Sequence, residues 1–254
     1  MSIVVTSDSV NAYYEKVFSE CLHNEQGLFD PPHPLFTELI SAPPKRSDAS
    51  GVELGYGCGN YSLEAAHLGY KMIAIDRIDQ IIFKNRVEQC GFADRIDVRQ
   101  MDLANFIPKD PFDLVISKDT LHFLERGTAD RLISTLARLT KPSGRHYLTI
   151  FVDITRISDD DKPILIQGEA NYSVDTFLEF LNRVYLNWKL EITIDSHEER
   201  SQRTGKIYFM AKRITICAQK AAEEGLTPGA YRWVSSEDLS AARQNRLPTH
   251  ETSG

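Results

Sequence analysis

The sequence predicts a doubly wound α/β fold, in which helices cover both faces of a seven-stranded, mainly parallel β-sheet. Two observations lead to this prediction. From Gly51 onward, short apolar segments typical of buried strands alternate with amphipathic segments typical of helices. The connections between these segments are short, and strand–helix alternation of this kind gives right-handed crossovers between parallel strands.

The elements of this series follow in chain order. Strands are expected at residues 51–55, 71–76, 96–102, 112–117, 145–151, 190–195 and 206–218. Helices are expected at residues 62–68, 80–90, 128–140 and 174–184. The polar segment 197–205 joins the last two strands and is too short for a helical crossover, so the last strand is expected to run antiparallel.

The two ends of the chain differ from this central series. Near the N-terminus, apolar residues recur at the three- and four-residue spacing of an amphipathic helix, namely Tyr13, Tyr14, Val17, Phe18 and Cys21. Prolines then require an extended linker, followed by a short helix at 35–40. We therefore expect a helical lid and linker at 1–50, an α/β domain at 51–220, and an appendage with a disordered end at 221–254.

Composition and charge exclude several functional classes. The 254 residues include 29 basic and 36 acidic side chains, which leaves a net charge of −7 and disfavours a nucleic-acid partner. No segment approaches the roughly 18 apolar residues of a membrane span, and no export signal is recognisable. The four cysteines and seven histidines lack metal-ligand spacing, so no metal site is expected. These features predict a cytoplasmic monomer or homodimer without a membrane partner.

The strongest functional signal lies between the first strand of the series and its first helix. Glu53 is followed by glycines at alternate positions, Gly55, Gly57 and Gly59, which let the backbone turn sharply and let a ligand approach closely. Asp76 ends the second strand, 21 residues after Gly55, where a carboxylate is placed to accept hydrogen bonds from ribose hydroxyls. This combination predicts a nucleoside-binding crevice, although a tight turn without a ligand is the alternative.

The spacing of the glycines favours one kind of nucleoside over another. A dinucleotide fingerprint has the form GxGxxG and places a pyrophosphate at the helix N-terminus, whereas this loop reads GxGxG. A carboxylate at Glu53 would repel a pyrophosphate but suits a ligand that carries an ammonium or a sulfonium. A nicotinamide-dependent oxidoreductase is therefore the least favoured enzyme class.

The acidic residue, the GxGxG loop and the strand-two acid together resemble motif I of the class I S-adenosylmethionine-dependent methyltransferases, which have a Rossmann-like fold. The resemblance covers about residues 35–220 and implies S-adenosyl-L-methionine as cofactor. It further implies that Asp102 contacts the adenine amino group, with Leu103 donating through its backbone. Arg77 would flank the ribose and adenine, and Lys118 begins the segment where the family lines the methyl-transfer site.

Within this family, the chain is most similar to the small tellurite-resistance-type methyltransferases. The similarity is carried by the entry pattern Gly27, Phe29, Pro32 and Leu35, by the segment 123–125, and by the tail strand 209–220. A longer N-terminal helix, the C-terminal appendage and a tyrosine inside the glycine loop depart from that pattern, so the substrate does not carry over.

Candidate residues for the reaction itself follow the fourth strand. His122 is the predicted general base, with Asp119 as the second choice, and Tyr172 is a candidate for the substrate-facing wall. Tyr14 could cover the cofactor, because aromatic faces stabilise a sulfonium cation. The alternatives are a structural His122, a Tyr14 that only packs in the first helix, and a Lys118 that only pairs with Asp119.

Three functional hypotheses follow, in order of preference. The first is an enzyme that methylates a small-molecule acceptor in a biosynthetic reaction. The second keeps the cofactor but closes its aminobutyrate arm into azetidine-2-carboxylate and releases methylthioadenosine. The third is a non-catalytic cofactor-binding protein, which the intact glycine loop disfavours.

Overall fold

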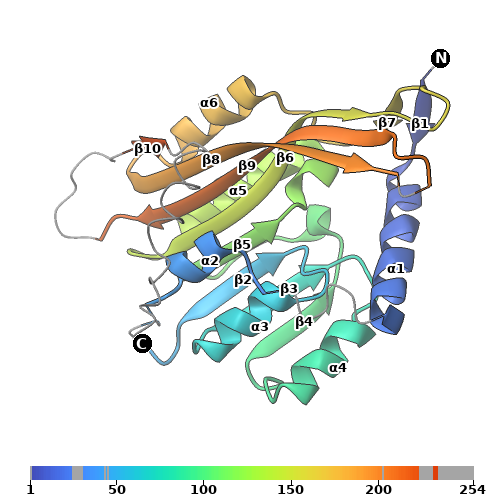
Figure 1. Cartoon of the computed structure of the whole chain (residues 1–254). Coiled ribbons are helices and arrows are strands. Elements are labelled where there is room, and N and C mark those ends of the chain that lie inside the picture. Colours follow the sequence, from blue (N-terminus) through green and yellow to red (C-terminus); the bar gives the residue numbers. More distant parts are fainter. Residues whose placement is uncertain are drawn as a thin grey trace, which may run out of the picture.

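The central feature of the protein is a twisted sheet with helices on both faces (Figure 1). A computed structural model describes residues 2–24, 31–42, 44, 46–201, 203–222 and 231–233. The strand order is β10-β8-β9-β6-β5-β2-β3-β4. Neighbours are parallel except that β9 runs antiparallel to both β6 and β8. The predicted doubly wound sheet of seven strands with an antiparallel last strand is thus confirmed.

The strands of this sheet lie close to the predicted positions. They are β2 (Ser50–Leu54), β3 (Lys71–Asp76), β4 (Ile96–Gln100), β5 (Leu114–Lys118), β6 (Arg145–Arg156), β8 (Trp188–Arg200), β9 (Ile207–Lys220) and β10 (Tyr231–Trp233). Strand β10 pairs in parallel with β8 and is an edge strand that the sequence did not predict. The remainder of the predicted appendage, apart from residues 221 and 222, lies outside the described residues.

The predicted end of the strand at 190–195 is wrong. The segment 197–205 was expected to be a connection because it is polar, but β8 continues to Arg200. The burial pattern alternates along this part of the strand, which shows that one face is solvated while the backbone still pairs with β9. An alternating polar strand of this kind has no apolar run, and the sequence prediction therefore missed it.

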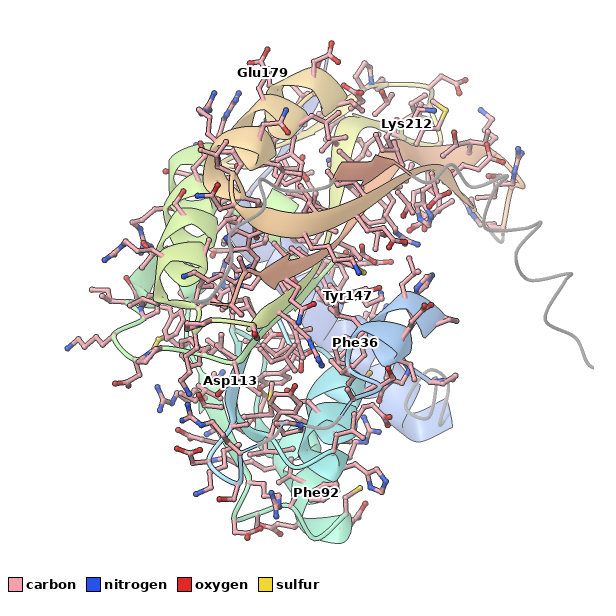
Figure 2. All side chains as sticks on the ribbon, turned by 90° about the vertical axis from the view of Figure 1, so that its left-hand side faces the viewer. Phe36, Phe92, Asp113, Tyr147, Glu179 and Lys212 are labelled. Atoms are coloured by element: carbon pink, nitrogen blue, oxygen red, sulfur yellow. The ribbon has the colours of Figure 1, made fainter. Side chains whose placement is uncertain are left out.

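The helices occupy the two faces of the sheet. They are α1 (Ser7–Asn24), α2 (Pro34–Leu39), α3 (Asn60–His67), α4 (Ile81–Gln89), α5 (Arg126–Leu139) and α6 (Val174–Val184). Helices α2, α3 and α4 share one apolar core with the sheet, whereas α5 and α6 share another. Figure 2 shows Phe36 of α2 against Tyr147 of β6, and their ring centroids are 5.3 Å apart. No helix within the described ranges has the length and apolar character of a bilayer span.

Helix α1 stands beside the sheet rather than on one of its faces, at the right of Figure 1. It follows strand β1 (Ile3–Val5), which pairs in parallel with β7 (Ile164–Ile166) in a separate two-stranded sheet. These strands of three residues were not predicted, since they are too short to show an alternation of apolar and polar side chains. The pairing holds the start of α1 against the segment between β6 and α6.

Candidate active site

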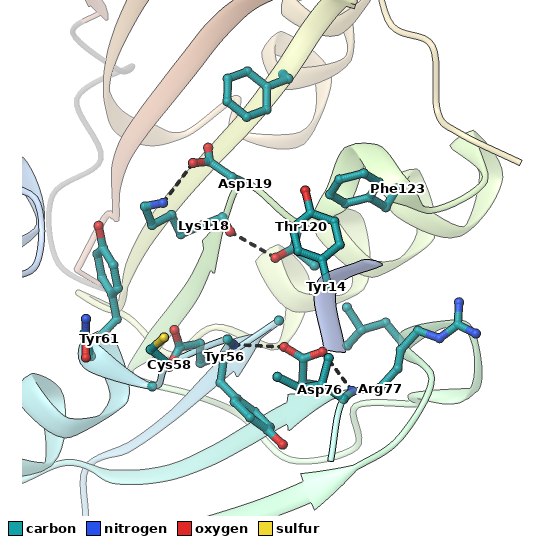
Figure 3. A pocket seen from close by; sticks show the side chains of 18 of the residues that line it. Tyr14, Tyr56, Cys58, Tyr61, Asp76, Arg77, Lys118, Asp119, Thr120 and Phe123 are labelled. Carbon is teal, nitrogen blue, oxygen red and sulfur yellow. Dashed lines mark hydrogen bonds and ion pairs between the residues drawn. The ribbon is translucent and has the colours of Figure 1, made fainter. Parts of the chain in front are cut away.

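A cavity of about 660 Å³ lies at the carboxyl ends of the parallel strands (Figure 3). This is the edge where a doubly wound sheet binds its ligands. One part is lined by the glycine loop and the ends of β3 and β4, at residues 53, 55–61, 76–78 and 103. A second part is lined by the end of β5 and the segment after it, and by residues of β6, β7, β8 and β9; these are residues 118–120, 123, 124, 151, 166, 199 and 213. Val10 and Tyr14 of α1 also line the cavity.

The glycine loop depends on glycine at two positions for packing as well as for backbone conformation. Gly55 and Gly59 have φ angles of 76° and 78°, in the left-handed region that side chains disfavour. A Cβ atom at Gly55 would overlap the side chain of Thr120, and one at Gly59 would overlap the ring of Phe83. Gly57, with φ of 49°, donates its N–H to Asp76. The backbone of this loop therefore lies directly along the cavity wall.

Asp76 ends β3 and faces the cavity, as its spacing predicts. Its Oδ2 accepts from the Gly57 N–H at 2.9 Å, and its Oδ1 accepts from the Ile78 N–H at 3.3 Å. Burial raises the pKa of this carboxyl above its usual range. Because a carboxylate can accept more than these two bonds, Asp76 is held rigidly yet keeps acceptor capacity for a ligand.

Glu53 is a nearly fully buried carboxyl on β2 that borders the cavity, with 1% of its surface exposed. Its Oε2 accepts from the Ser62 N–H at 3.0 Å and from the Ser62 hydroxyl. Desolvation raises the pKa of Glu53 to about 8, and the Ser62 bonds oppose that rise only in part. In the ligand-free protein Glu53 is therefore mostly protonated at neutral pH, and a cation placed beside it would favour its ionised form.

Helix α1 contributes a tyrosine and an ion pair at the mouth of the cavity. The ring of Tyr14 meets that of Phe123 edge to face, with 5.4 Å between centroids, and Figure 3 shows the two together. Burial, and then the charge of Glu199, raises the pKa of Tyr14 to about 12. Asp8 of α1 pairs with Arg77 at 3.5 Å. The helix thus contacts both parts of the cavity, which is the location that a lid requires.

Asp102 and Leu103 occupy different positions relative to the cavity. Leu103 is buried and lines it. Strand β4 ends earlier than predicted, at Gln100, and Asp102 instead caps a short 3-10 helix (Leu103–Asn105), accepting from the Ala104 N–H at 2.8 Å. The Asp102 carboxylate lies 4.0 Å from Arg77 and is 38% exposed. The structure does not include Asp102 among the residues that line the cavity.

Asp119 joins two cations at the end of β5. Its Oδ2 lies 2.9 Å from Lys118 Nζ and 3.3 Å from a terminal nitrogen of Arg213, while its Oδ1 accepts from the Thr149 hydroxyl at 2.7 Å. Burial alone would raise the pKa of Asp119, but these cations and the hydroxyl outweigh it and hold the pKa below its usual value. Asp119 lines the cavity as an ionised counter-ion, which makes it a poor general base.

His122 does not line the cavity, although it was the predicted base. It is 2% exposed and its ring packs against Phe123 and Phe151, with centroid distances of 4.0 and 5.2 Å. Burial lowers the pKa of His122 to about 3, and its Nδ1 has no hydrogen-bond partner. The residue lies in a short 3-10 helix (Leu121–Phe123) that turns the imidazole into the interior. The structure therefore places the imidazole in the interior, behind Phe123 and Phe151, which do line the cavity.

Tyr172 is likewise a core residue rather than a wall of the cavity. It is 2% exposed, and its hydroxyl donates to Asp130 of α5 at 2.6 Å. The guanidinium of Arg126 lies 5.0 Å over its ring. The buried hydroxyl is thus hydrogen-bonded within the protein, and both the hydroxyl and the aromatic ring of Tyr172 contact residues of α5.

Two residues that line the cavity and were not singled out in the sequence are Phe151 and Arg213. Arg213 had a detectable signal, because it stands with Lys212 in the middle of a mostly apolar strand. Phe151 had none, since a phenylalanine in a strand is common. Glu199 belongs to the polar segment 197–200, for which a place on a pocket wall was the less favoured alternative to a solvated strand end. Across the described ranges, no three His, Cys, Asp or Glu side chains gather closely enough to hold a metal ion.

The comparisons with known proteins agree with this geometry. The family described as methyltransferase domain matches residues 52–144, the segment from the glycine loop through the fourth crossover. Residues 52–144 are thus similar to a methyltransferase domain, in agreement with the resemblance predicted from the GxGxG loop and Asp76. Such domains use S-adenosylmethionine as their cofactor, and the buried Glu53 and the fixed acceptor at Asp76 would suit its ammonium and its ribose. A search of curated proteins gives no match.

Solved structures share the fold of the methyltransferase domain at low sequence identity. TehB from Haemophilus influenzae is 19% identical with a TM-score of 0.54, over 72% of this chain and 61% of TehB. This match fits the predicted likeness to tellurite-resistance-type proteins. The 1,6-didemethyltoxoflavin-N1-methyltransferase of Burkholderia thailandensis, with bound S-adenosylhomocysteine, is 14% identical with a TM-score of 0.54, over 87% and 93%. The [4+2]-cyclase SpnF is 15% identical with a TM-score of 0.56, over 87% and 98%.

Proposed function

We propose that this protein transfers a methyl group from S-adenosylmethionine to a small-molecule acceptor. The observation that carries the proposal is the continuity of one cavity, which joins the glycine loop and Asp76 to a second part lined by Phe123 and Phe151. A cofactor held in the first part would face an acceptor in the second. The cofactor supplies an electrophilic methyl group on a positively charged sulfur.

In the cofactor part of the cavity, each residue has a role that follows from its surroundings. Asp76 accepts hydrogen bonds from the ribose hydroxyls, because the backbone of Gly57 and Ile78 already holds its carboxylate in place. Glu53 becomes the counter-ion of the ammonium group, since its ionised form needs a cation in this buried position. Leu103 supplies an apolar surface for the adenine.

The remaining task of the protein is to align the acceptor and exclude water. Holding two reactants at about 3–3.5 Å in the correct orientation supplies roughly 7–11 kcal/mol of rate acceleration. Tyr14, packed on Phe123, closes the cavity from the side of α1, and its ring can face the sulfonium. A base is required only where the acceptor arrives protonated.

If a base acts, Glu199 is better situated than His122. Glu199 lines the cavity from β8, accepts from the Tyr208 hydroxyl and lies 3.2 Å from His197. Within the described part of the chain it makes no ion pair with a lysine or an arginine, in contrast to Asp119. Among the described residues, its carboxylate therefore borders the cavity without a lysine or arginine partner.

The proposal is tested by identifying the nucleoside product. The purified protein is incubated with S-adenosylmethionine alone and then with pools of candidate acceptors, and products are identified by mass spectrometry. S-adenosylhomocysteine that forms only with an acceptor supports methyl transfer. Methylthioadenosine that forms without an acceptor would instead support closure of the aminobutyrate arm. Binding without either product would favour the non-catalytic hypothesis.

A further inference from the structure

The acceptor part of the cavity has walls of distinct chemistry. Apolar and aromatic side chains form most of it, from α1, β6, β7 and the segment after β5, namely Tyr14, Phe123, Leu124, Phe151 and Ile166. Arg213 of β9 and Asp119 of β5 interrupt this apolar surface. An apolar pocket with a few convergent polar groups fixes the orientation of a small ligand through those groups.

The charges beside this surface do not balance. Lys118 and Arg213 both pair with Asp119, at 2.9 and 3.3 Å. Among the described residues, no other carboxylate lies within ion-pair distance of either cation. Because the pKa of Asp119 lies below its usual value, this carboxylate is fully ionised and contributes one negative charge against two positive charges. The wall therefore has an excess of one positive charge, and the cofactor sulfonium would add another.

Arg213 has capacity for a further partner. Its guanidinium lies 4.8 Å over the ring of Phe151, and its one ion pair with a described residue is that with Asp119. Its Nε is buried without a hydrogen-bond partner, while 32% of its side chain is exposed. A guanidinium has five N–H donors, so one carboxylate on one edge leaves several unused. The side chain is thus fixed in position by Phe151 and Asp119, with donors remaining.

The neighbouring acids do not supply the missing negative charge. Asp195 lies opposite Arg213 in the register of β8 and β9 but makes no ion pair with it. Glu199 stands four residues farther along β8, about 13 Å away along the strand, where it contacts Tyr208 and His197. The uncompensated charge is therefore local to Arg213 and Lys118.

We infer that the methyl acceptor is an aromatic acid, whose carboxylate binds the unused donors of Arg213 while its ring lies against Phe123 and Leu124. The inference rests on the proposed function and names its acceptor class. A carboxylate matches the planar guanidinium and would balance the excess positive charge. A neutral molecule of the same shape would cover the apolar surface, but Arg213 would then have Asp119 as its one anionic partner among the described residues.

The experiment measures binding of matched probes to the protein saturated with S-adenosylhomocysteine. The probes are benzoate, 4-hydroxybenzoate and indole-3-carboxylate, each compared with its primary amide by titration calorimetry. The wild-type protein is expected to bind at least one acid about tenfold or more tightly than its amide. Arg213→Gln should remove this preference, and Arg213→Lys should retain part of it.

Lys212→Gln is the matched control. Lys212 is the adjacent residue on β9, is exposed, and donates to Ser196 at 2.8 Å, so the substitution removes the same charge from the opposite face of the strand. It should leave the preference for acids intact. The inference is overturned if no acid binds more tightly than its amide, or if the preference survives in Arg213→Gln.

The proposed function and the assignment of the acceptor can be refuted separately. S-adenosylhomocysteine affinity is measured first in every variant, together with the thermal midpoint of unfolding. Absence of that affinity in the wild-type protein would refute the proposed function itself. Normal cofactor affinity with equal binding of acids and amides would refute only the assignment of the acceptor. If Arg213→Gln does not fold, Arg213→Lys and Lys212→Gln still provide the comparison.

Discussion

The buried carboxyl of Glu53 makes cofactor binding depend on pH in a specific way. In the ligand-free protein the pKa of Glu53 is about 8, so the group is protonated at neutral pH. The ligand contributes the α-amino group of a free amino acid, whose neighbouring carboxylate keeps its pKa above the value of about 7.7–8.0 that holds for a peptide N-terminus. Binding through an ion pair requires Glu53 to be ionised and the amino group to be protonated at the same time. Affinity should therefore rise from pH 6 to pH 8 as Glu53 ionises, and fall at higher pH once the amino group loses its proton.

The magnitude follows from the two protonation equilibria. At pH 6 about 1% of Glu53 is ionised and at pH 8 about half of it, while most of the ligand stays protonated at both pH values. The fraction of protein and ligand in the required form rises roughly 40-fold, which corresponds to about 2 kcal/mol of binding free energy. Near pH 7, binding should release most of one proton per ligand.

Titration calorimetry with S-adenosylhomocysteine, in two buffers of different ionisation enthalpy, measures both quantities. Glu53→Gln should bind with nearly constant affinity between pH 6 and 7.5 and should release no proton. Glu88→Gln, an exposed substitution on α4, is the control and should behave as the wild type. A wild-type affinity that does not change between pH 6 and 8, without proton release, would show that Glu53 does not meet the ammonium group.

Three further predictions concern the loop and the core. Asp76→Ala should weaken S-adenosylhomocysteine binding by about 1–3 kcal/mol in the same titration, and unchanged affinity would place the ribose elsewhere. Gly59→Ala should lower the free energy of unfolding in urea by more than Gly91→Ala, because both have positive φ but only the former meets Phe83; equal losses would contradict the packing role. Burial lowers the pKa of His146 to about 3, so the unfolded chain binds a proton near pH 6.5 that the folded chain does not, and stability is lost as pH falls. From pH 7 to 5, His146→Gln should lose about 2 kcal/mol less unfolding free energy than the wild type, and equal losses would indicate a solvated imidazole.

The cofactor half of the site could be predicted from the sequence because its signals are local. Alternating strands and helices predict a parallel sheet, and parallel strands bring their carboxyl ends to one edge. The glycine loop and Asp76 each lie at the end of such a strand, so their proximity in space follows from the fold class alone. Glu53 was noticed for the same reason, although its burial and raised pKa could not be read from the pattern.

Only the tertiary structure decided the acceptor half. His122 and Phe123 are neighbours in the chain, yet one lies in the core and the other at the cavity, because a single 3-10 turn sets their directions. Arg213 reaches the cavity because β9 inserts antiparallel between β6 and β8, which brings it beside Phe151. Such contacts depend on strand register and packing between residues far apart in the chain, and no local pattern encodes them. The sequence by itself determined the fold class and the cofactor edge, while packing selected which side chains face the acceptor.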